Sequence, residues 1–69
     1  MSPMNERIKQ LRHQRGISQV ELAQMLNTTN DTVSLWELNK RSPSVEDLKS
    51  ICLIFNVTAD YLLGLTDIY

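Results

Sequence analysis

The sequence is poor in the residues that stabilise small proteins through covalent or metal bonds. It contains one cysteine and one histidine in 69 residues, so neither an intramolecular disulfide nor a Cys/His metal site is available. Two glycines and two prolines interrupt the chain, and no apolar run is long enough for a membrane span or a secretory signal. We therefore expect one cytoplasmic domain that is stabilised by packed apolar side chains and has no membrane contact.

Catalytic groups are also scarce. His13 lies among basic residues, and we expect it on the surface. Cys52 lies on an apolar stripe without a base partner, so we expect it to pack in the core rather than to act as a nucleophile. The sequence has no glycine-rich phosphate loop and no paired acid and base. It therefore predicts a protein that is not an enzyme and that binds no cofactor, metal or small molecule.

The net charge of −1 argues mildly against nucleic-acid binding, because DNA-binding domains usually carry an excess of lysine and arginine. The charges are unevenly distributed, however. Residues 1–43 carry six basic and four acidic groups, whereas residues 44–69 carry one basic and four acidic groups. We expect the first part of the chain to present its modest positive excess to phosphates.

Apolar residues at helical spacing dominate the chain, with almost no strand-like alternation. Met4, Ile8 and Leu11 predict a helix over residues 5–15, and Gly16 follows its last turn. Further helices are predicted over residues 19–26, 30–38, 45–55 and 59–63. The predicted fold class is all-α, a compact five-helix domain over residues 5–64 with a flexible N-terminus (1–4) and a short C-terminal tail (65–69).

The clearest local signal is a capping box at the start of the second helix. The Ser18 side chain is expected to accept a hydrogen bond from the amide of Glu21, and the Glu21 carboxylate to reach back. Hydroxyl caps are also predicted before the later helices, at Thr29, Ser44 and Thr58. Asn27 can adopt the left-handed conformation in the short break before the third helix. The second and third helices should therefore meet at a sharp angle.

Residues 5–64 contain a series of short fragments whose order and spacing are informative when they are taken together. They are Ile17-Ser18-Gln19, Glu21-Leu22-Ala23, Leu26, Thr32-Val33-Ser34, Trp36-Glu37, Pro43-Ser44 and Tyr61-Leu62-Leu63-Gly64. Each fragment is common by itself, but together they resemble the lambda-repressor/Cro-like (Xre-type) family. The resemblance implies a helix-turn-helix formed by the second and third helices, double-stranded DNA as the partner, and action as a homodimer.

The resemblance places the third helix in the major groove, where its first turn reads base edges. The residues implied are Asn30, Asp31, Thr32 and Leu35. Asn30 can pair with adenine, Asp31 can accept a hydrogen bond from the cytosine amino group, and Leu35 can contact a thymine methyl group. None of the four is basic, whereas family members often have arginine or glutamine there. Helix capping is the alternative role for Asp31.

Phosphate contacts are implied for a second set of residues: Ser18, Gln19, Thr29, Ser34, Lys40 and Arg41. Gln19 begins the second helix, and Lys40 and Arg41 follow the third. Simple solvation is the alternative for two adjacent basic residues in a loop. Capping is likewise the alternative for Thr29.

One pair of charges is predicted to be structural. Arg12 lies four residues after Ile8, and Glu37 lies four residues after Val33, so each charge extends an inward-facing stripe. The family has the same arrangement. We predict that Arg12 and Glu37 form a partly buried ion pair that fixes the third helix.

Two functions remain open from the sequence. The first is a sequence-specific transcriptional repressor that binds a palindromic operator as a dimer. The second is a protein-binding module that keeps the fold but has little affinity for DNA, with Leu35 and Leu38 in an apolar binding patch. For dimerisation the candidates are Leu53, Val57 and Tyr61, although Val57 and Tyr61 are equally suited to the core. Other apolar residues are left over near the C-terminus: Ile54, Leu65, Ile68 and Tyr69.

Overall fold

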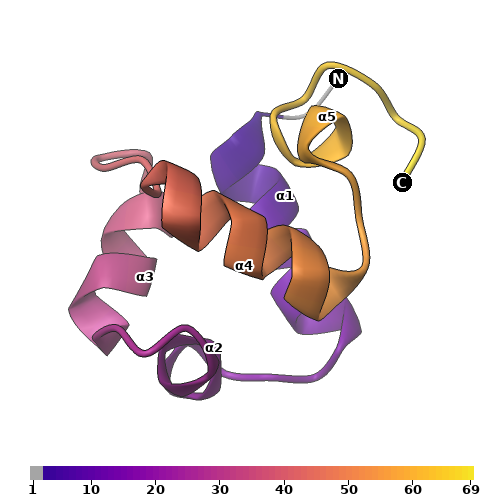
Figure 1. Cartoon of the computed structure of the whole chain (residues 1–69). Helices are drawn as coiled ribbons and strands as arrows, with labels where there is room; N and C mark the ends of the chain where they lie inside the picture. Colours follow the sequence, from indigo (N-terminus) through magenta and orange to yellow (C-terminus); the bar gives the residue numbers. More distant parts are fainter. Residues whose placement is uncertain (1–2) are drawn as a thin grey trace.

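The computed structural model describes residues 3–69, and within this range it contains five helices and no strand. They are α1 (Met4–Gln14), α2 (Gln19–Met25), α3 (Asn30–Glu37), α4 (Val45–Phe55) and α5 (Ala59–Leu62) (Figure 1). The all-α prediction is confirmed. Met4 was assigned to a flexible N-terminus, but it is the first residue of α1 and packs against the core. Residues 1 and 2 of that predicted segment lie outside the described residues.

Hydroxyl side chains begin four of the five helices. Each accepts a hydrogen bond from the backbone amide three residues later, at Ser18, Thr29, Ser44 and Thr58. At Ser18 the capping box is complete, because the Glu21 carboxylate accepts a hydrogen bond of 3.0 Å from the Ser18 amide. These caps satisfy amides that have no partner within the helix, which fixes where each helix begins.

Every helix is followed within two residues by a residue in the left-handed conformation. These residues are Gly16, Asn27, Asn39, Asn56 and Gly64, with φ between 55° and 81°. The following amide bonds back into the last turn, as when Thr28 N donates to Ala23 O (2.9 Å) and Lys40 N donates to Leu35 O (2.9 Å). Glycine and asparagine tolerate positive φ best, so these positions end the helices sharply and keep the loops short.

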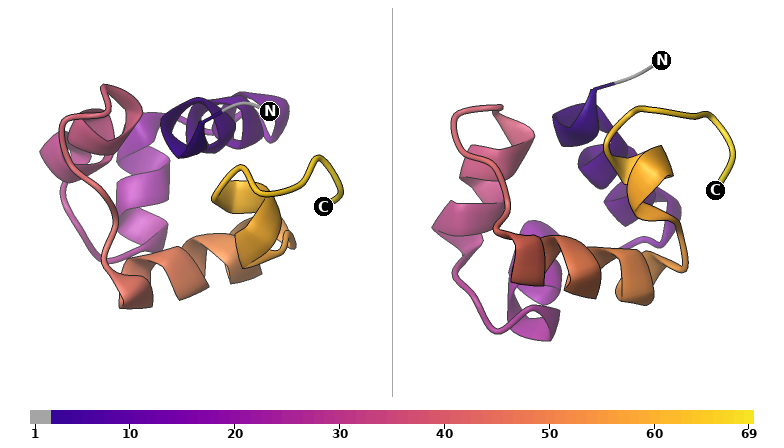
Figure 2. Two further views of the ribbon diagram at one scale, coloured as in Figure 1. Left: turned by 90° about the horizontal axis from the view of Figure 1, so that it is seen from above. Right: turned by 45° about the horizontal axis from the view of Figure 1, so that its top comes forward.

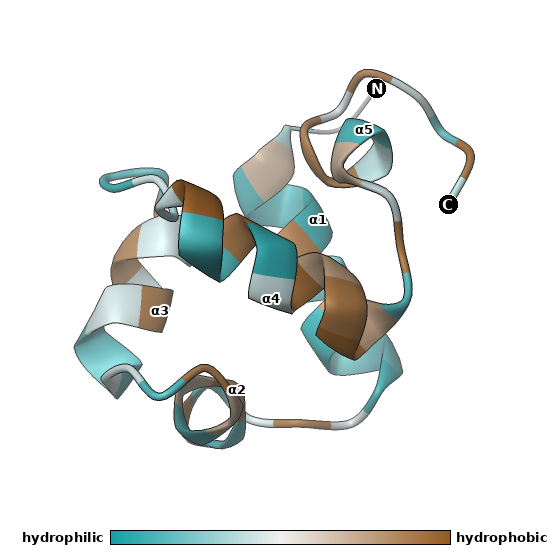
Figure 3. Ribbon diagram, in the orientation of Figure 1, coloured by the Kyte–Doolittle hydropathy of each residue, from teal (hydrophilic) through white to brown (hydrophobic). Residues whose placement is uncertain are grey.

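The core draws at least one side chain from every helix. Its buried apolar residues are Ile8, Leu11, Leu22, Ala23, Val33, Trp36, Ile51, Phe55, Val57, Tyr61 and Leu62. In Figure 3 the helices carry both hydrophilic and hydrophobic segments, as expected for helices with one buried face. Val57 and Tyr61 therefore belong to the core, whereas the third dimerisation candidate, Leu53, is 83% exposed.

The helices divide the molecule into two ends. The α2 and α3 helices pack against each other at one end, and α5 with the C-terminal segment forms the other (Figure 2). Between them, α1 contacts both α3 and α5, and α4 contacts α5. The α1 helix therefore contacts both the helix-turn-helix end and the C-terminal end.

Candidate nucleic-acid interface

The turn between α2 and α3 exposes the first turn of α3. Asn27 has a φ of 56°, as predicted, and Thr29 caps α3 by accepting from the Thr32 amide at 3.2 Å. Asn30 and Asp31, the first two residues of α3, are both exposed. The polar start of α3 is thus free to meet a partner.

The predicted base-reading residues do not all lie on the same face of α3. Val33 and Trp36 are buried, which fixes the inward face. By helical periodicity, Asp31, Leu35 and Leu38 lie on the opposite side. Of these, Leu35 is half-buried and Leu38 is 61% exposed.

Thr32 lies elsewhere on α3. Its hydroxyl is 2.9 Å from that of Thr29, and it lines a hollow together with residues from the start of α4. Thr32 therefore occupies a flank of α3 rather than its outward side.

The predicted phosphate-contacting residues differ in their exposure and in their hydrogen bonds. Ser18 and Thr29 are exposed, but both hydroxyls are engaged as helix caps. Ser34 is half-buried on α3. Lys40 and Arg41 are exposed directly after α3, where their amides bond back to the Leu35 carbonyl. These backbone bonds fix the start of the loop that carries the two cations.

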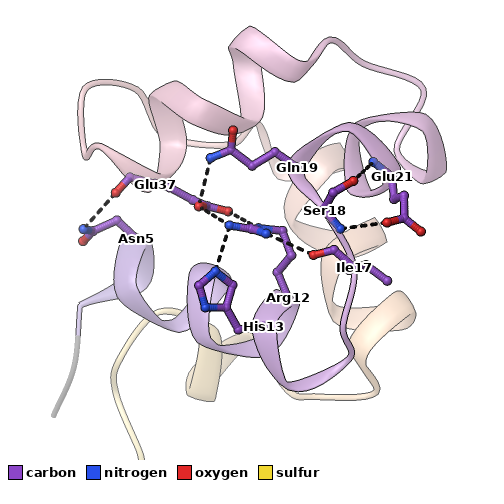
Figure 4. A network of polar contacts seen from close by, with 8 residues as sticks. All are labelled: Asn5, Arg12, His13, Ile17, Ser18, Gln19, Glu21 and Glu37. Carbon is purple, nitrogen blue, oxygen red and sulfur yellow. Dashed lines mark hydrogen bonds and ion pairs between the residues drawn. The ribbon is translucent and has the colours of Figure 1, made fainter.

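Arg12 and Glu37 meet across α1 and α3 in a two-point contact (Figure 4). Arg12 Nε donates to Glu37 Oε2 at 2.8 Å, and Arg12 Nη2 donates to Glu37 Oε1 at 3.0 Å. The two side chains are only 10% and 4% exposed. Gln19 Nε2 also donates to Glu37 Oε1 at 3.1 Å. One carboxylate therefore ties together α1, the start of α2 and the end of α3.

The cluster keeps Glu37 ionised. Burial of the carboxylate raises its pKa, but hydrogen bonds from Arg12 and Gln19 and the nearby charges of Arg12 and Lys9 outweigh that effect. The net result is a pKa of Glu37 below its usual range. The hydrogen bond to Glu37 likewise raises the pKa of Arg12, against the opposing effect of burial. The ion pair is therefore charged at neutral pH.

The Gln19 side chain retains hydrogen-bonding capacity beyond its bond to Glu37. Its side-chain amide carries two N–H groups, and a single hydrogen bond to Glu37 leaves one of them for another acceptor. The side chain is held in place by a buried carboxylate on its inner side. The second N–H group therefore remains available to an acceptor other than Glu37.

Some of the arginines counted among the basic residues of the first part of the chain are not free on the surface. Arg7 and Arg12 are buried, and Arg15 donates to the Phe55 carbonyl at 2.6 Å. The burial of Arg7 was not predicted, although the sequence carries a signal for it. Arg7 lies three residues after Met4 and four before Leu11, and therefore on the inward stripe of α1.

The structure also places the single histidine and the single cysteine of the chain. His13 is exposed, with Nε2 3.2 Å from Arg12 Nη2. Cys52 is half-buried at the edge of the core, and burial raises the pKa of its thiol, which disfavours the reactive thiolate. Within residues 3–69, no group of three or more His, Cys, Asp or Glu side chains could hold a metal ion. No helix in that range has the length and apolar character needed to cross a bilayer.

Comparison with known proteins identifies the family. Residues 8–62 match the model of the helix-turn-helix family HTH_3. The chain belongs to this family. The resemblance to lambda-repressor/Cro-like proteins, drawn from the sequence fragments, is thereby confirmed.

Two family relatives are transcriptional regulators by name. The chain is 41% identical over 60 residues to the HTH-type transcriptional activator BcrR of Enterococcus faecalis, which covers 87% of this chain and 29% of BcrR. It is 36% identical over 61 residues to the HTH-type transcriptional regulator ImmR of Bacillus subtilis, covering 88% and 48%. The chain thus spans less than half the length of each relative.

A solved structure of a family member supports the same fold. The P22 c2 repressor, in complex with a synthetic operator, superposes with a TM-score of 0.85 at 32% sequence identity. The match covers 91% of this chain and 96% of the repressor chain. The five-helix arrangement described above is therefore that of a repressor-type helix-turn-helix domain.

Proposed function

We propose that this chain binds double-stranded DNA as a transcriptional regulator by placing the first turn of α3 in the major groove. The observation that carries the proposal is the exposed polar start of α3, where Asn30 and Asp31 are both exposed. Gln19 bonds to Glu37 at the end of the same helix, and the exposed Lys40 and Arg41 follow that end in the chain. A similar fold is present in a repressor whose structure contains its operator DNA. The family relatives named above are regulators rather than enzymes.

The proposed division of labour follows the exposure of the residues. Asn30 and Asp31 read base edges, with adenine and cytosine as the bases that their side chains match. Leu35 contacts a thymine methyl group from the outward side of α3. Phosphates are contacted by Ser18, Gln19, Thr29, Ser34, Lys40 and Arg41. The Arg12–Glu37 pair orients α3 and Gln19 but contacts no DNA itself.

We further propose that the protein acts in the cytoplasm as a homodimer on a palindromic operator. Two copies related by a twofold axis would place two α3 helices about 34 Å apart, which is one turn of DNA. Leu53, Leu65 and Ile68 are exposed apolar residues away from α3 and supply surface for such an association. Occupation of the operator by the dimer would repress transcription.

The experiment that tests DNA binding is a titration of a fluorescent mixed-sequence duplex at several salt concentrations. Because binding to phosphates releases counterions, the affinity should fall steeply as salt rises. Lys40→Gln should weaken binding and reduce the slope of log K against log salt by about 0.9. Lys49→Gln, which removes an exposed lysine on α4, is the matched control and should change neither quantity. No measurable binding at low salt would refute the proposal.

One observation favours a second candidate function. Leu38 is 61% exposed on the same side of α3 as Leu35, and apolar side chains on a surface helix suit a protein partner. Binding to such a partner would depend little on salt and would be lost on Leu38→Ser. If the chain instead binds DNA through the first turn of α3, the Leu38→Ser variant should keep its affinity for DNA.

A further inference from the structure

A polar hollow lies beside α3, on the flank that faces the start of α4. Its volume is about 320 Å³, which corresponds to roughly ten water molecules at about 30 Å³ each. The lining residues come from the α2–α3 turn, α3, the α3–α4 loop and the first turn of α4: Thr28, Thr32, Trp36, Arg41, Ser42, Ser44 and Asp47. The hollow is therefore large enough for a small organic molecule.

Two opposite charges line the hollow without neutralising each other. The Arg41 guanidinium and the Asp47 carboxylate both belong to its wall. The ion pairs found within residues 3–69 involve neither of these side chains. An unpaired cation and an unpaired anion beside the same space suit a ligand that itself carries both charges.

Trp36 contributes a hydrogen-bond donor without a partner. Its side chain is only 2% exposed, and its indole N–H forms no hydrogen bond with the described residues. No side-chain nitrogen or oxygen that is completely buried lacks a partner in residues 3–69. The indole nitrogen therefore reaches the surface, and the surface that Trp36 lines is this hollow. An indole N–H can only donate, so the missing partner is an acceptor.

The remaining groups set a carboxylate apart from a simple anion. Ser44 accepts from the Asp47 amide at 3.1 Å, which leaves its hydroxyl proton free to donate. With Arg41 and the Trp36 indole it forms a set of donors that suits a carboxylate. The Asp47 carboxylate, however, repels any ligand that is only negative and attracts an ammonium group. The hollow therefore favours a zwitterion over an anion.

We infer that the hollow binds a free α-amino acid with a short polar side chain. The carboxylate of the ligand accepts from the Arg41 guanidinium and the Trp36 indole N–H, and its ammonium group lies against Asp47. The hydroxyl groups of Thr28 and Ser42 are left for the polar side chain. The sequence predicted no small-molecule ligand, because the segments that line the hollow come together only in the fold.

The bound amino acid competes with DNA for Arg41. Arg41 is one of the residues proposed to contact phosphate, so this part of the inference rests on the proposed function. A guanidinium that holds the carboxylate of the ligand is not free to hold a phosphate. The amino acid therefore weakens the complex with DNA.

A direct test uses the single tryptophan of the chain, which gives one indole signal in a nitrogen–proton NMR spectrum. The labelled full chain is titrated with L-glutamine and, separately, with L-serine. The indole signal should shift downfield and saturate with a dissociation constant of about 1 mM for at least one of them. No saturable shift with either amino acid up to about 20 mM would overturn the inference.

Acetate and ethylammonium are the control ligands, because each carries only one of the two charges. Each loses one ionic contact, so each should need a concentration about tenfold higher than the amino acid to reach half-saturation. Acetate that saturated the indole signal as readily as the amino acid would overturn the assignment and make the hollow a simple anion site.

Asp47→Asn separates a zwitterion from an anion. Removal of this carboxylate should weaken amino-acid binding about threefold and tighten acetate binding about threefold. Glu46→Gln removes the neighbouring charge of the same first turn, but Glu46 does not line the hollow, so this control should change both affinities less. Tighter binding of both ligands to Asp47→Asn would contradict an ammonium group beside Asp47.

The competition is tested with a mixed-sequence duplex. Saturating amino acid should weaken duplex binding by the same factor as Arg41→Gln does, and it should have no further effect on that variant. A zwitterion has no net charge, so its addition does not screen the DNA contacts as salt does. Unchanged duplex affinity beside a shifted indole signal would overturn the competition and leave the amino-acid site standing. If the chain bound no duplex at all, the proposed function would fail, whereas the indole titration would still decide whether the amino acid binds.

Discussion

The two buried arginines of α1 serve the two ends of the molecule in different ways. Arg12 binds a carboxylate that is itself buried, since the Glu37 side chain is 4% exposed. Arg7 binds Asp67, which is 75% exposed, and it also donates to the backbone carbonyls of Tyr61 and Thr66. A buried arginine therefore needs buried acceptors, but these need not carry charge. We expect the end of α1 with the buried ion pair to be the more sensitive to loss of one partner.

The Arg7 end also explains why residues 65–69 are not a free tail. The Arg7 guanidinium lies 4.2 Å from the centre of the Tyr61 ring, and the rings of Tyr61 and Tyr69 are 4.7 Å apart. The C-terminal segment is thus anchored over α1 and α5. This segment lies away from the α2–α3 end. Substitutions in the C-terminal segment should therefore affect the stability of the fold without affecting DNA contact.

The largest effect is expected from Glu37→Gln. Glutamine keeps the shape of the side chain but leaves Arg12 buried without its counter-charge, which should lower the free energy of unfolding by about 3 kcal/mol. DNA affinity should fall as well, because Gln19 and α3 lose their common anchor. Urea unfolding and duplex titration measure the two effects. An unchanged melting temperature together with unchanged DNA binding would show that the pair does not orient α3.

The effect of Glu37→Gln should also depend on pH. The folded-state pKa of Glu37 is lowered, so its stabilising contribution is complete above the unfolded value of about 4.3. That contribution is lost as the pH falls through the folded-state pKa. The difference in unfolding free energy between wild type and variant should therefore narrow below about pH 4. A difference that stayed constant from pH 7 to pH 3 would rule out the charge as its source.

An intermediate effect is expected from Arg7→Met. Methionine fills the space of the arginine stem but leaves the carbonyls of Tyr61 and Thr66 without their donor, at a cost of about 1–2 kcal/mol. The DNA affinity of the folded variant should equal that of wild type, which separates this arginine from Arg12. A loss of DNA affinity in Arg7→Met without a loss of stability would contradict the claim that Arg7 stabilises only the C-terminal end.

The smallest effect is expected from Asp67→Asn. An exposed carboxylate contributes less than about 1 kcal/mol to an ion pair, and Arg7 keeps its backbone acceptors in this variant. The difference from wild type should vanish in high salt, because exposed charges are screened. If Asp67→Asn destabilised the protein as much as Glu37→Gln, burial of the partner would not be the deciding factor.

Features that depend on local sequence could be predicted. The Ser18–Glu21 capping box and the left-handed Asn27 depend on neighbouring residues, and both are present. The Arg12–Glu37 contact was also foreseen, because each charge extends an apolar stripe. These signals were sufficient to predict the fold class and the sharp angle between α2 and α3.

Features that depend on distant backbone or on shared surfaces could not be predicted. The acceptors of Arg7 are carbonyls 54 and 59 residues away, and a carbonyl has no sequence signature. The hollow beside Trp36 arises only when the turn, the loop and the start of α4 come together. The position of Thr32 on the flank of α3, beside the Thr29 hydroxyl, likewise depends on how α3 packs.

The most direct test of the central claim is selection of bound sequences from a random pool of duplexes, done in parallel with wild type and Asn30→Ala. We predict that wild type enriches a palindromic motif, and that Asn30→Ala enriches the same motif with preference lost at one base position in each half-site. Lys40→Ala should weaken all sites alike and leave the motif intact. Selection of an identical motif by Asn30→Ala, with undiminished preference at every position, would contradict base reading by the exposed start of α3.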